Sequence, residues 1–472
     1  MGKKVLAAKS GRAACSCAAA GGGIAAKNAK SAESLTQRHK GTEKMKSSGN
    51  PWIGDVPEGW EVSRVKHHYE LILGKMLCVT SNNEANVRLP YVCAANVHFE
   101  GVALSDLKEM WFSTIEVKQY AIREGDLLVV EGGAGAGGAA ICPRIEAAVG
   151  IQNSIILVRN KNCRDNRYLR YLLEALVKNG YVNFVCNKAT IPHFTKDKLG
   201  NVPIPLPPLP EQQAIVAYLD EKCGAIDEAI VEAKKGIEEY KAWKTSLIDD
   251  VVCNGIVRHR HRKETGEVWL ADIPIEWDFV QIRYLFALRD ERNDKPLKDV
   301  NLISLYTDKG VVQHADLEKT TGNKASTADG YKLVYENDIV VNIILCWMGA
   351  VGRSAYNGVT SPAYDVYRPI DPTKVLSRYY HYLFRTPRFN GKCYEEGRGI
   401  MMMRWRTYSS EFRAIKVPVP PFEEQQAIAD YLDEKCAAID AMVAEKEALI
   451  ADLEAYKKSL IYETVTGKRR MP

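Results

Sequence analysis

The stretch from Pro205 to Asp227, PLPPLPEQQAIVAYLDEKCGAID, decides the fold because the chain contains it twice. The second copy runs from Pro418 to Asp440 and reads PVPPFEEQQAIADYLDEKCAAID. Without a gap, 17 of the 23 aligned positions are identical, at a constant offset of 213 residues. The chain is therefore predicted to be one structural unit written twice.

The sequence before each copy supports the same division. The segment Trp52–Trp60, WIGDVPEGW, is similar to Trp269–Trp277, WLADIPIEW, at an offset of 217 residues. Farther along the chain, EGDLLVV at 124–130 is similar to ENDIVVN at 336–342. Between these matches the two halves diverge strongly. We therefore expect two domains that share a fold and whose variable interiors contact different targets.

The repeated stretch has the features of a helix start followed by a long helix. Pro210 fits the first helical turn, and Glu211 complements the positive end of a helix. Apolar residues then recur at alternating spacings of four and three, the period of a helix pair. In the first copy they are Ile226, Ile230, Ala233, Ile237 and Tyr240. In the second copy they are Ile439, Val443, Ile450, Leu453 and Leu460, with Lys446 and Lys457 interrupting the period. Because such a helix is about 65 Å long, we expect the two to pair. Two helices that each pack on their own domain are the alternative.

The net charge of +5 is unevenly distributed. Residues 1–44 alone carry +7 and are rich in Ala, Gly, Ser and Lys, so this tail is expected to be disordered. Both predicted helices are acidic, whereas the chain outside the tail and helices sums to +10. Two basic runs, Arg258–Lys263 and Lys468–Arg470, contribute to that excess, and they either contact phosphate or are simply solvated.

Composition and motifs exclude several classes of protein. The 12 cysteines are scattered, with no C-x-x-C pair and no His/Cys cluster, which indicates reduced thiols, a cytoplasmic location and no metal site. No apolar run approaches about 18 residues, so no membrane span is expected. Walker-type, G-x-S-x-G and H-E-x-x-H motifs are absent, as is the Asn-Pro-Pro-aromatic tetrapeptide of adenine methyltransferases. The chain is therefore predicted to be non-catalytic.

One glycine motif argues for an enzyme. Gly133, Gly135 and Gly138 follow a strand-like segment in the spacing of a phosphate-binding loop. However, Pro143 lies too near for a following helix, and the second unit lacks the pattern at 343–352. A tight backbone loop is the favoured interpretation, and a nucleotide-binding enzyme is the alternative.

The duplicated proline-rich Glu-Gln-Gln segment, the two Trp-x4-Pro-x2-Trp openings and the alternation of domain and helix resemble the specificity (S) subunit of type I restriction-modification systems. The resemblance extends from about residue 45 to the end. It implies an α+β fold with two similar α/β target recognition domains, each followed by a long helix, and an antiparallel coiled coil between the helices. The implied segments are a basic tail at 1–44, recognition domain 1 at 45–205, a central spacer helix at 206–256, recognition domain 2 at 257–416, a distal spacer helix at 417–466 and a basic tail at 467–472.

The resemblance also implies the function and the partners. Each recognition domain reads one half of a bipartite site on double-stranded DNA, and the helices set the spacer. The subunit docks two modification subunits and, in the full complex, two restriction subunits. S-adenosylmethionine, ATP and Mg²⁺ belong to those partners, so this chain is expected to bind no cofactor. The implied spacer and docking residues are Glu211, Gln212, Gln213, Ile226, Ile230 and Ile237, with Glu424, Gln425, Gln426, Ile439, Val443 and Ile450.

Two other interpretations stay open beside the family resemblance. One is an S-like DNA-recognition protein that serves another type of methylase, and the other is a coiled-coil scaffold whose domains bind proteins. Recovery of a methyltransferase subunit distinguishes the scaffold from the S subunit. Because members with this pattern open close to the Trp-Ile-Gly motif, we also hypothesise that Met45 is the natural start and that the tail is not native.

Candidate DNA-contacting residues lie where basic, polar and aromatic side chains alternate before each spacer helix. Arginine matches guanine and amides match adenine, while lysine and arginine also anchor phosphate. The candidates are Lys188, His193 and Lys196 in the first unit and Arg398, Arg404, Arg406 and Tyr408 in the second. Weaker candidates are Arg88 and Arg292, together with Asn82, Asn83, Arg289 and Lys295. The alternative is that Met401–Met403 and Trp405 belong to a core and the arginines are merely solvated.

Overall fold

The computed structural model describes residues 44–81, 83–161, 164–186, 192–316, 327–399 and 405–470. The chain divides into two compact units. Unit 1 comprises the residues up to Ile230 together with those from Ala451 onward, and unit 2 comprises Val231–Ile450. Each unit holds one variable domain and one part of each of two long helices. The predicted combination of two α/β domains, each followed by a long helix, is confirmed.

Unit 1 is built on a four-stranded antiparallel sheet of order β10-β9-β12-β4. The strands β9 (Leu127–Val130) and β12 (Ile155–Asn160) form its centre because their apolar runs are buried on both faces. The outer strands are β10 (Ala139–Ile141) and β4 (Tyr69–Leu73). A second sheet of order β11-β5-β8 contains β11 (Gly150–Ile151), β5 (Val87–Val92) and β8 (Lys108–Phe112). Three small strand pairs complete the domain: β1 (Met45–Ser47) with β2 (Asp55–Pro57), β3 (Glu61–Arg64) with β13 (Pro203–Leu206), and β6 (Val97–His98) with β7 (Gly101–Val102).

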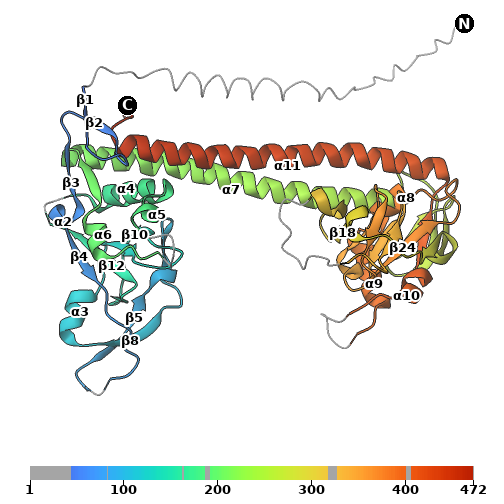
Figure 1. Cartoon of the computed structure of the whole chain (residues 1–472), viewed down its shortest axis with the longest axis horizontal. Helices are drawn as coiled ribbons and strands as arrows, with labels where there is room; N and C mark the ends of the chain where they lie inside the picture. The colour runs from blue at the N-terminus through green and yellow to red at the C-terminus, as the bar shows by residue number, and fades with distance from the viewer. Residues whose placement is uncertain are drawn as a thin grey trace, which may run out of the picture. The chain divides into compact units, whose positions relative to one another are not determined.

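Helix α4 (Asn166–Lys178) connects this sheet to the first long helix. Asp165 caps it by accepting a hydrogen bond from the Arg167 N–H, at 2.8 Å. Both its sheet-facing and helix-facing sides are buried, and Figure 1 shows it between the strands and α7. The shorter helices of unit 1 are α2 (Val65–His68), α3 (Thr114–Tyr120), α5 (Tyr181–Val185) and α6 (Lys196–Gly200).

Unit 2 repeats this sheet order. Its main sheet runs β22-β21-β24-β17, formed by Val351–Arg353, Ile339–Asn342, Tyr364–Pro369 and Phe286–Arg289. The remaining pairs are β14 (Arg262–Glu267) with β15 (Leu270–Pro274), β16 (Asp278–Gln281) with β25 (Lys416–Val419), β18 (Ile303–Tyr306) with β19 (Gly310–Gln313), and β20 (Lys332–Val334) with β23 (Gly358–Thr360). The short helices of unit 2 are α8 (Ser377–Leu383), α9 (Pro387–Glu396) and α10 (Ser409–Ala414). Its 3-10 turns are η2 (Ile282–Tyr284), η3 (Leu297–Asp299), η4 (His314–Asp316) and η5 (Cys346–Met348), and unit 1 has the 3-10 turn η1 (Ala94–Asn96).

The long helices are α7 (Leu209–Asn254, 46 residues) and α11 (Phe422–Val465, 44 residues). In unit 1 the beginning of α7 pairs with the end of α11, and Lys457 Nζ lies 2.7 Å from Asp227 Oδ2. In unit 2 the end of α7 pairs with the beginning of α11, and Lys244 Nζ lies 2.6 Å from Asp440 Oδ2. The helices are therefore antiparallel, and each ion pair is the repeat counterpart of the other at an offset of 213 residues.

The predicted seam is confirmed by burial. Ile226, Ile230, Ala233 and Ile237 of α7 are each at most 8% exposed, as are Ile439 and Leu460 of α11. The end of the seam in unit 2 joins a large aromatic core of that unit, in which Trp277, Tyr379 and Phe412 are fully buried.

Candidate DNA-recognition surface and helix joints

Each long helix is joined to its domain by a tryptophan and a glutamate that the repeat had singled out. In unit 1 the Trp60 Nε1 donates to Glu211 Oε2 at 3.2 Å. In unit 2 the Trp277 Nε1 donates to Glu424 Oε2 at 2.9 Å. Both indoles are at most 4% exposed. The opening motif of each unit therefore contacts the first turn of the helix that closes it.

The joint in unit 2 carries an additional cation. The Arg260 guanidinium pairs with the Glu424 carboxylate. Burial opposes ionisation of this carboxyl, but the hydrogen bonds from Arg260 and Trp277 outweigh it and hold the pKa of Glu424 below its usual value.

The two glutamines of each Glu-Gln-Gln motif point to opposite sides of the helix. Gln212 and Gln425 are 0% exposed. Gln212 Nε2 donates to the Pro207 carbonyl at 2.8 Å, and its Oε1 accepts from Asp165 N–H at 3.3 Å. Gln213 and Gln426, the next residues, are exposed.

A tyrosine of each domain bonds to an aspartate farther along its helix. Tyr171 of α4 donates its hydroxyl to Asp220 Oδ1 of α7 at 2.6 Å. Tyr382 of α8 donates to Asp433 Oδ1 of α11 at 2.5 Å. Burial first, and then the hydrogen bond to the carboxylate, raise the pKa of both phenols. With the tryptophan and glutamine contacts, each helix is held at three successive positions.

The implied spacer and docking residues thus fall into two groups. Ile226, Ile230, Ile237 and Ile439 are buried in the seam, Val443 and Ile450 are partly buried in it, and Glu211, Gln212, Glu424 and Gln425 make the joints. These ten residues hold the subunit itself together. Among the twelve, Gln213 and Gln426 are the two that are exposed.

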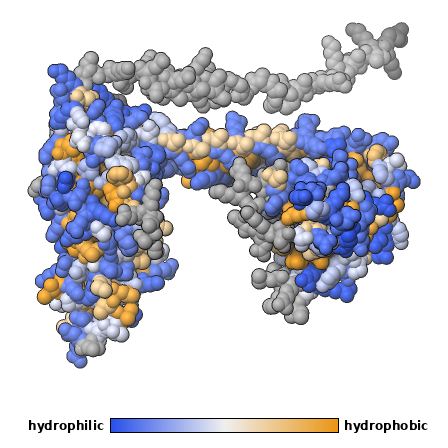
Figure 2. All heavy atoms as spheres, in the orientation of Figure 1, coloured by the Kyte–Doolittle hydropathy of each residue, from blue (hydrophilic) through white to orange (hydrophobic). Residues whose placement is uncertain are grey.

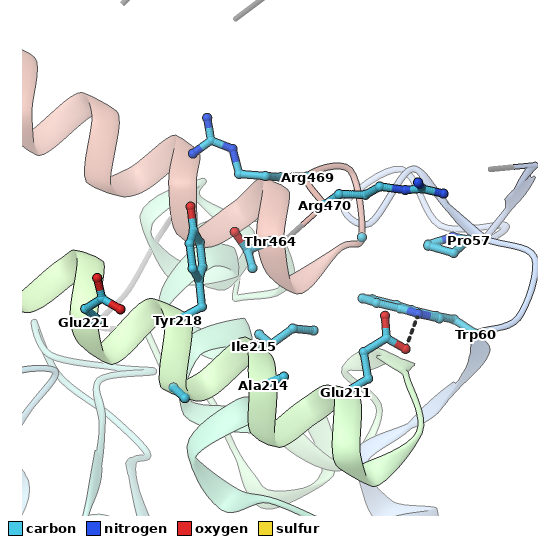
Figure 3. A pocket seen from close by; sticks show the side chains of 12 residues that line it. Pro57, Trp60, Glu211, Ala214, Ile215, Tyr218, Glu221, Thr464, Arg469 and Arg470 are labelled. Carbon is cyan, nitrogen blue, oxygen red and sulfur yellow. Dashed lines mark hydrogen bonds between the residues drawn. The ribbon is translucent and has the colours of Figure 1, made fainter. Parts of the chain in front are cut away.

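The joint of unit 1 borders a cavity of about 430 Å³ (Figure 3). Trp60, Glu211 and Tyr218 line one part of it, and Arg469 and Arg470 line another. Gly467, which follows the end of α11, also lines it and has a φ of +71°. An added Cβ there would lie 2.4 Å from the Pro57 side chain, so a glycine is required for the close approach.

Both basic runs that were considered for phosphate contact are engaged within their own units. In unit 1, Lys468 Nζ donates to the Ile53 carbonyl at 2.9 Å, and Arg469 lies 3.3 Å from Glu463. In unit 2, arginines of the run at 258–262 pair with Asp250, Glu424 and Asp272. These contacts favour a structural role over phosphate binding.

The glycine motif of unit 1 lies beside the segment that contains the DNA-contacting candidates. Gly133 N–H donates to the Pro192 carbonyl at 3.2 Å, and Phe194 N–H donates to the Glu131 carbonyl at 2.5 Å. His193 forms a bridge with Gly132 and is exposed, as is Lys196 at the start of α6. Lys188 lies outside the described residues. Two segments far apart in the sequence thus form one surface.

The same motif does not form a phosphate-binding loop. The glycines connect β9 to β10, which pair antiparallel in a hairpin, whereas a dinucleotide site needs the loop to open a helix. This topology confirms the tight backbone loop and removes the basis for the nucleotide-binding enzyme.

In unit 2 two of the candidates, Arg398 and Arg406, face each other across a backbone bridge. Arg398 N–H donates to the Arg406 carbonyl at 2.8 Å, and Arg406 N–H donates back at 3.0 Å. The Arg398 side chain is 76% exposed and 3.1 Å from Glu411, and Tyr408 is exposed. Arg404 and Met401–Met403 lie outside the described residues.

The weaker candidates are spread over other parts of the domains. Arg88 lies on β5 and pairs with Glu109 at 3.2 Å, with both side chains about half exposed. Arg292 pairs with Asp290 at 2.6 Å. Arg289 is 14% exposed and bonds to the buried Asp338, contacts that favour a structural role over DNA binding. Asn83 is exposed, Lys295 donates its backbone N–H to Asn293 Oδ1, and Asn82 lies outside the described residues.

Among the described residues, no group of three or more His, Cys, Asp or Glu side chains is arranged to hold a metal ion. Over the same part of the chain, no helix has the length and apolar character needed to cross a bilayer. The nine cysteines that are described are free thiols.

The fold and the site define a class of protein: two like domains on an antiparallel helix pair, with shared joints and unlike exposed loops. The sequence matches the type I restriction modification DNA specificity domain twice, over residues 57–235 and 274–450. The chain belongs to this family. It is a DNA specificity subunit of a type I restriction-modification system and is itself non-catalytic.

Relatives of known sequence and structure agree with this assignment. The chain is 24% identical to the type I restriction enzyme MjaVIII specificity subunit of Methanocaldococcus jannaschii, over 88% of this chain and 94% of the relative. It is similar in fold to the HsdS subunit of Thermoanaerobacter tengcongensis, with a TM-score of 0.52 and 16% identity over 88% of this chain and 98% of that one. A chain from a study of complex assembly and conformational transition of the type I R-M system superposes with a TM-score of 0.65 and 15% identity, over 88% and 99% of the two chains.

Sequence reasoning missed several residues of the site. Tyr171 and Tyr382 stand in similar runs, YLRY and YYHY, and a comparison of the helices before the proline-rich segments would have found them. Trp347 contacts Tyr394, and Tyr394 stacks on Trp405; Trp347 and Tyr394 have no local signal, because Trp347 is distant in sequence from Tyr394.

Proposed function

We propose that each recognition domain reads one half of a bipartite site on double-stranded DNA and that the helix pair fixes the spacing between the halves. The single observation that carries this proposal is the contrast between the two copies. The joints at Trp60 and Trp277 repeat, while the candidate residues before the closing part of each domain differ in type: unit 1 has His193 and Lys196, and unit 2 has Arg398, Arg406 and Tyr408. A shared frame with unlike loops suits two readers of different sequences.

The chemistry of the loops supports contact with duplex DNA. Arg398 and Arg406 stand on one paired loop, where guanidinium groups can fork onto guanine or anchor phosphate. In unit 1, His193 lies just before α6 and Lys196 is the first residue of that helix. Lys188 and Arg404 belong to the same proposal on sequence grounds.

We further propose that the helices dock two modification subunits, with two restriction subunits joining in the full complex. Gln213 and Gln426 are exposed at equivalent positions near the helix starts, so each can contact one copy of the same partner. On the face of the helix pair seen in Figure 2, apolar and hydrophilic residues lie side by side, a mixture that suits a protein interface. The cofactors of the reaction are then supplied by those partners.

Methylome sequencing tests the bipartite reading. A host that carries this chain with its neighbouring modification gene should contain adenine methylation in a motif split by a non-specific spacer. A continuous motif would contradict the proposal. An S-like subunit of another methylase type would give methylation without the split.

A domain exchange tests the division of labour. Replacing residues 55–200 with another recognition domain should change one half-site and leave the other unchanged. The same purified complexes test docking, because a modification subunit should be recovered with both the parent and the exchanged chain. Loss of both half-sites with intact recovery of the partner would mean that the domains do not read independently.

A further inference from the structure

Three aromatic side chains of unit 2 contact one another next to the backbone bridge between Arg398 and Arg406. Trp405 and Tyr394 are stacked with ring centroids 4.9 Å apart and planes 23° apart. Trp347 lies against the same tyrosine, with centroids 5.6 Å apart. The Trp405 Nε1 donates to the Tyr394 carbonyl at 3.0 Å, and the Trp347 Nε1 donates to the Ile344 carbonyl at 3.0 Å. Both indoles are therefore fixed in orientation as well as in position.

The base of the loop is tied to the domain on its other side. Thr407 is 0% exposed, its Oγ1 donates to the Cys393 carbonyl at 2.9 Å, and its N–H donates to the Ile343 carbonyl at 2.9 Å. Arg406 therefore stands between the stacked Trp405 and the buried Thr407. Its neighbour across the loop, Arg398, is held by the two backbone hydrogen bonds between them.

Gly397 shows that the domain makes room for this stack. Its φ of −72° and ψ of 162° are ordinary for any residue, so the backbone does not require glycine. A Cβ at this position would lie 2.3 Å from Trp405 Nε1 and 2.8 Å from its Cδ1. Since those atoms belong to a ring held by stacking and a hydrogen bond, any side chain here would displace Trp405.

We propose that Trp347, Tyr394 and Trp405 are positioning residues that hold Arg398 and Arg406 in place for reading the second half-site on duplex DNA. This rests on the proposed function. A forked guanidinium contact to a guanine depends on orientation, and one good contact of this kind discriminates bases by about 5- to 150-fold. An arginine on a loosely held loop loses that selectivity while it still attracts phosphate.

Unit 1 holds its corresponding segment by different means. His193 is bridged to Gly132, and its carbonyl accepts hydrogen bonds from Cys186 Sγ at 3.1 Å and from Lys198 Nζ at 2.7 Å. An indole also packs just before this segment, where Trp52 contacts Tyr181 and Phe184 of α5 with ring centroids 5.5 and 5.3 Å apart. The cluster of Trp347, Tyr394 and Trp405 is specific to the second reader because all three residues lie in unit 2. Its loss should affect one half-site selectively.

The test compares Gly397→Ala with Gly391→Ala in the complete complex with modification subunits. Gly391 lies within α9 and Gly397 follows its last residue, but a Cβ at Gly391 meets no atom within 4 Å. Binding is measured on duplexes that carry single-base changes in either half-site. We expect Gly397→Ala to reduce discrimination for at least one base of the second half-site by about tenfold. Gly391→Ala should match the parent, and discrimination in the first half-site should stay within about twofold for both variants.

Trp405→Phe provides a second route to the same answer, because it keeps a smaller ring on Tyr394 and removes the hydrogen bond to the Tyr394 carbonyl. It should give a smaller loss in the same half-site. If Gly397→Ala and Trp405→Phe both keep full discrimination, or if both half-sites weaken equally, the anchor proposal is wrong. Failure of the bipartite reading itself appears separately, as a continuous motif for the parent chain.

Discussion

Replacing Gln425 by alanine, with Gln426→Ala as the control, tests the division of the Glu-Gln-Gln motif into an inner and an outer glutamine. Gln425 is 0% exposed, and its side chain makes three hydrogen bonds to backbone groups of unit 2. It donates to the carbonyls of Lys374 and Pro420, both at 2.9 Å, and accepts from the Leu376 N–H at 2.8 Å. Gln426 is exposed. Two identical neighbours therefore face different environments.

The expected magnitude follows from what each substitution leaves behind. A buried polar group without its partner costs about 1–3 kcal/mol, and alanine at Gln425 removes the partner of three such groups. Because a carbonyl retains a second lone pair, we expect a total loss of about 3–5 kcal/mol of unfolding free energy. Gln426→Ala should change it by less than about 0.5 kcal/mol. Gln212→Ala should fall between them, at about 2–3 kcal/mol, because Gln212 makes two such bonds and one is 3.3 Å long.

Urea denaturation followed by circular dichroism measures these differences. Because the chain has two units that can unfold separately, amide hydrogen exchange should locate the loss of Gln425→Ala at α8 and the start of α11. Recovery of the modification subunit supplies the opposite readout, since Gln426→Ala should weaken it while leaving stability unchanged. Equal urea midpoints for Gln425→Ala and Gln426→Ala would refute the reasoning.

Three further predictions concern the helices. Lys244→Asp should lower the free energy of unfolding by no more than about 1 kcal/mol, because the ion pair with Asp440 is partly exposed. Adding Asp440→Lys should restore the stability in a double-mutant cycle. No recovery would mean that the pair does not form. The pKa of Glu424 is lowered in the folded chain, so its contribution to folding stability is complete above the pKa of about 4.3 that it has when unfolded, and is lost as pH falls through the folded pKa. Glu424→Gln should therefore remove that part of the acid dependence of the urea midpoint. An unchanged acid dependence would count against the joint. One heptad inserted at equivalent positions in both helices adds about 10.5 Å, or about three base pairs of DNA. The spacer of the methylated motif should lengthen by that amount, or assembly should fail. An unchanged spacer would mean that the helices do not set the spacer length.

The repeated parts of the fold were predictable because their signals are local or can be compared within the chain. The helix period at Ile226, Ile230 and Ile237 gave the seam, and the constant offset gave the equivalence of the two sheets. Pro210 fell in the first turn of α7 as expected. Each of these follows from spacing along a single segment.

The site was less predictable because its contacts join distant segments. The Glu-Gln-Gln motif was recognised, yet the burial of Gln212 depends on Asp165, 47 residues away. Arg289 looked like a DNA ligand in sequence, and only the fold brings it to the buried Asp338. Likewise, Trp347 reaches Tyr394 because η5 packs against α9, a contact that no local pattern announces.

The positions of the joints limit which domain exchanges can succeed. One partner of each contact lies on the helix, at Glu211 and Asp220, and the other lies in the domain, at Trp60 and Tyr171. An incoming domain therefore has to bring its own indole and phenol in the same register, although its reading loops are unrestricted. Unit 2 meets this condition with Trp277 and Tyr382 while its loops differ. The duplication thus separates the residues that must match the helix from those that are free to change with the DNA sequence.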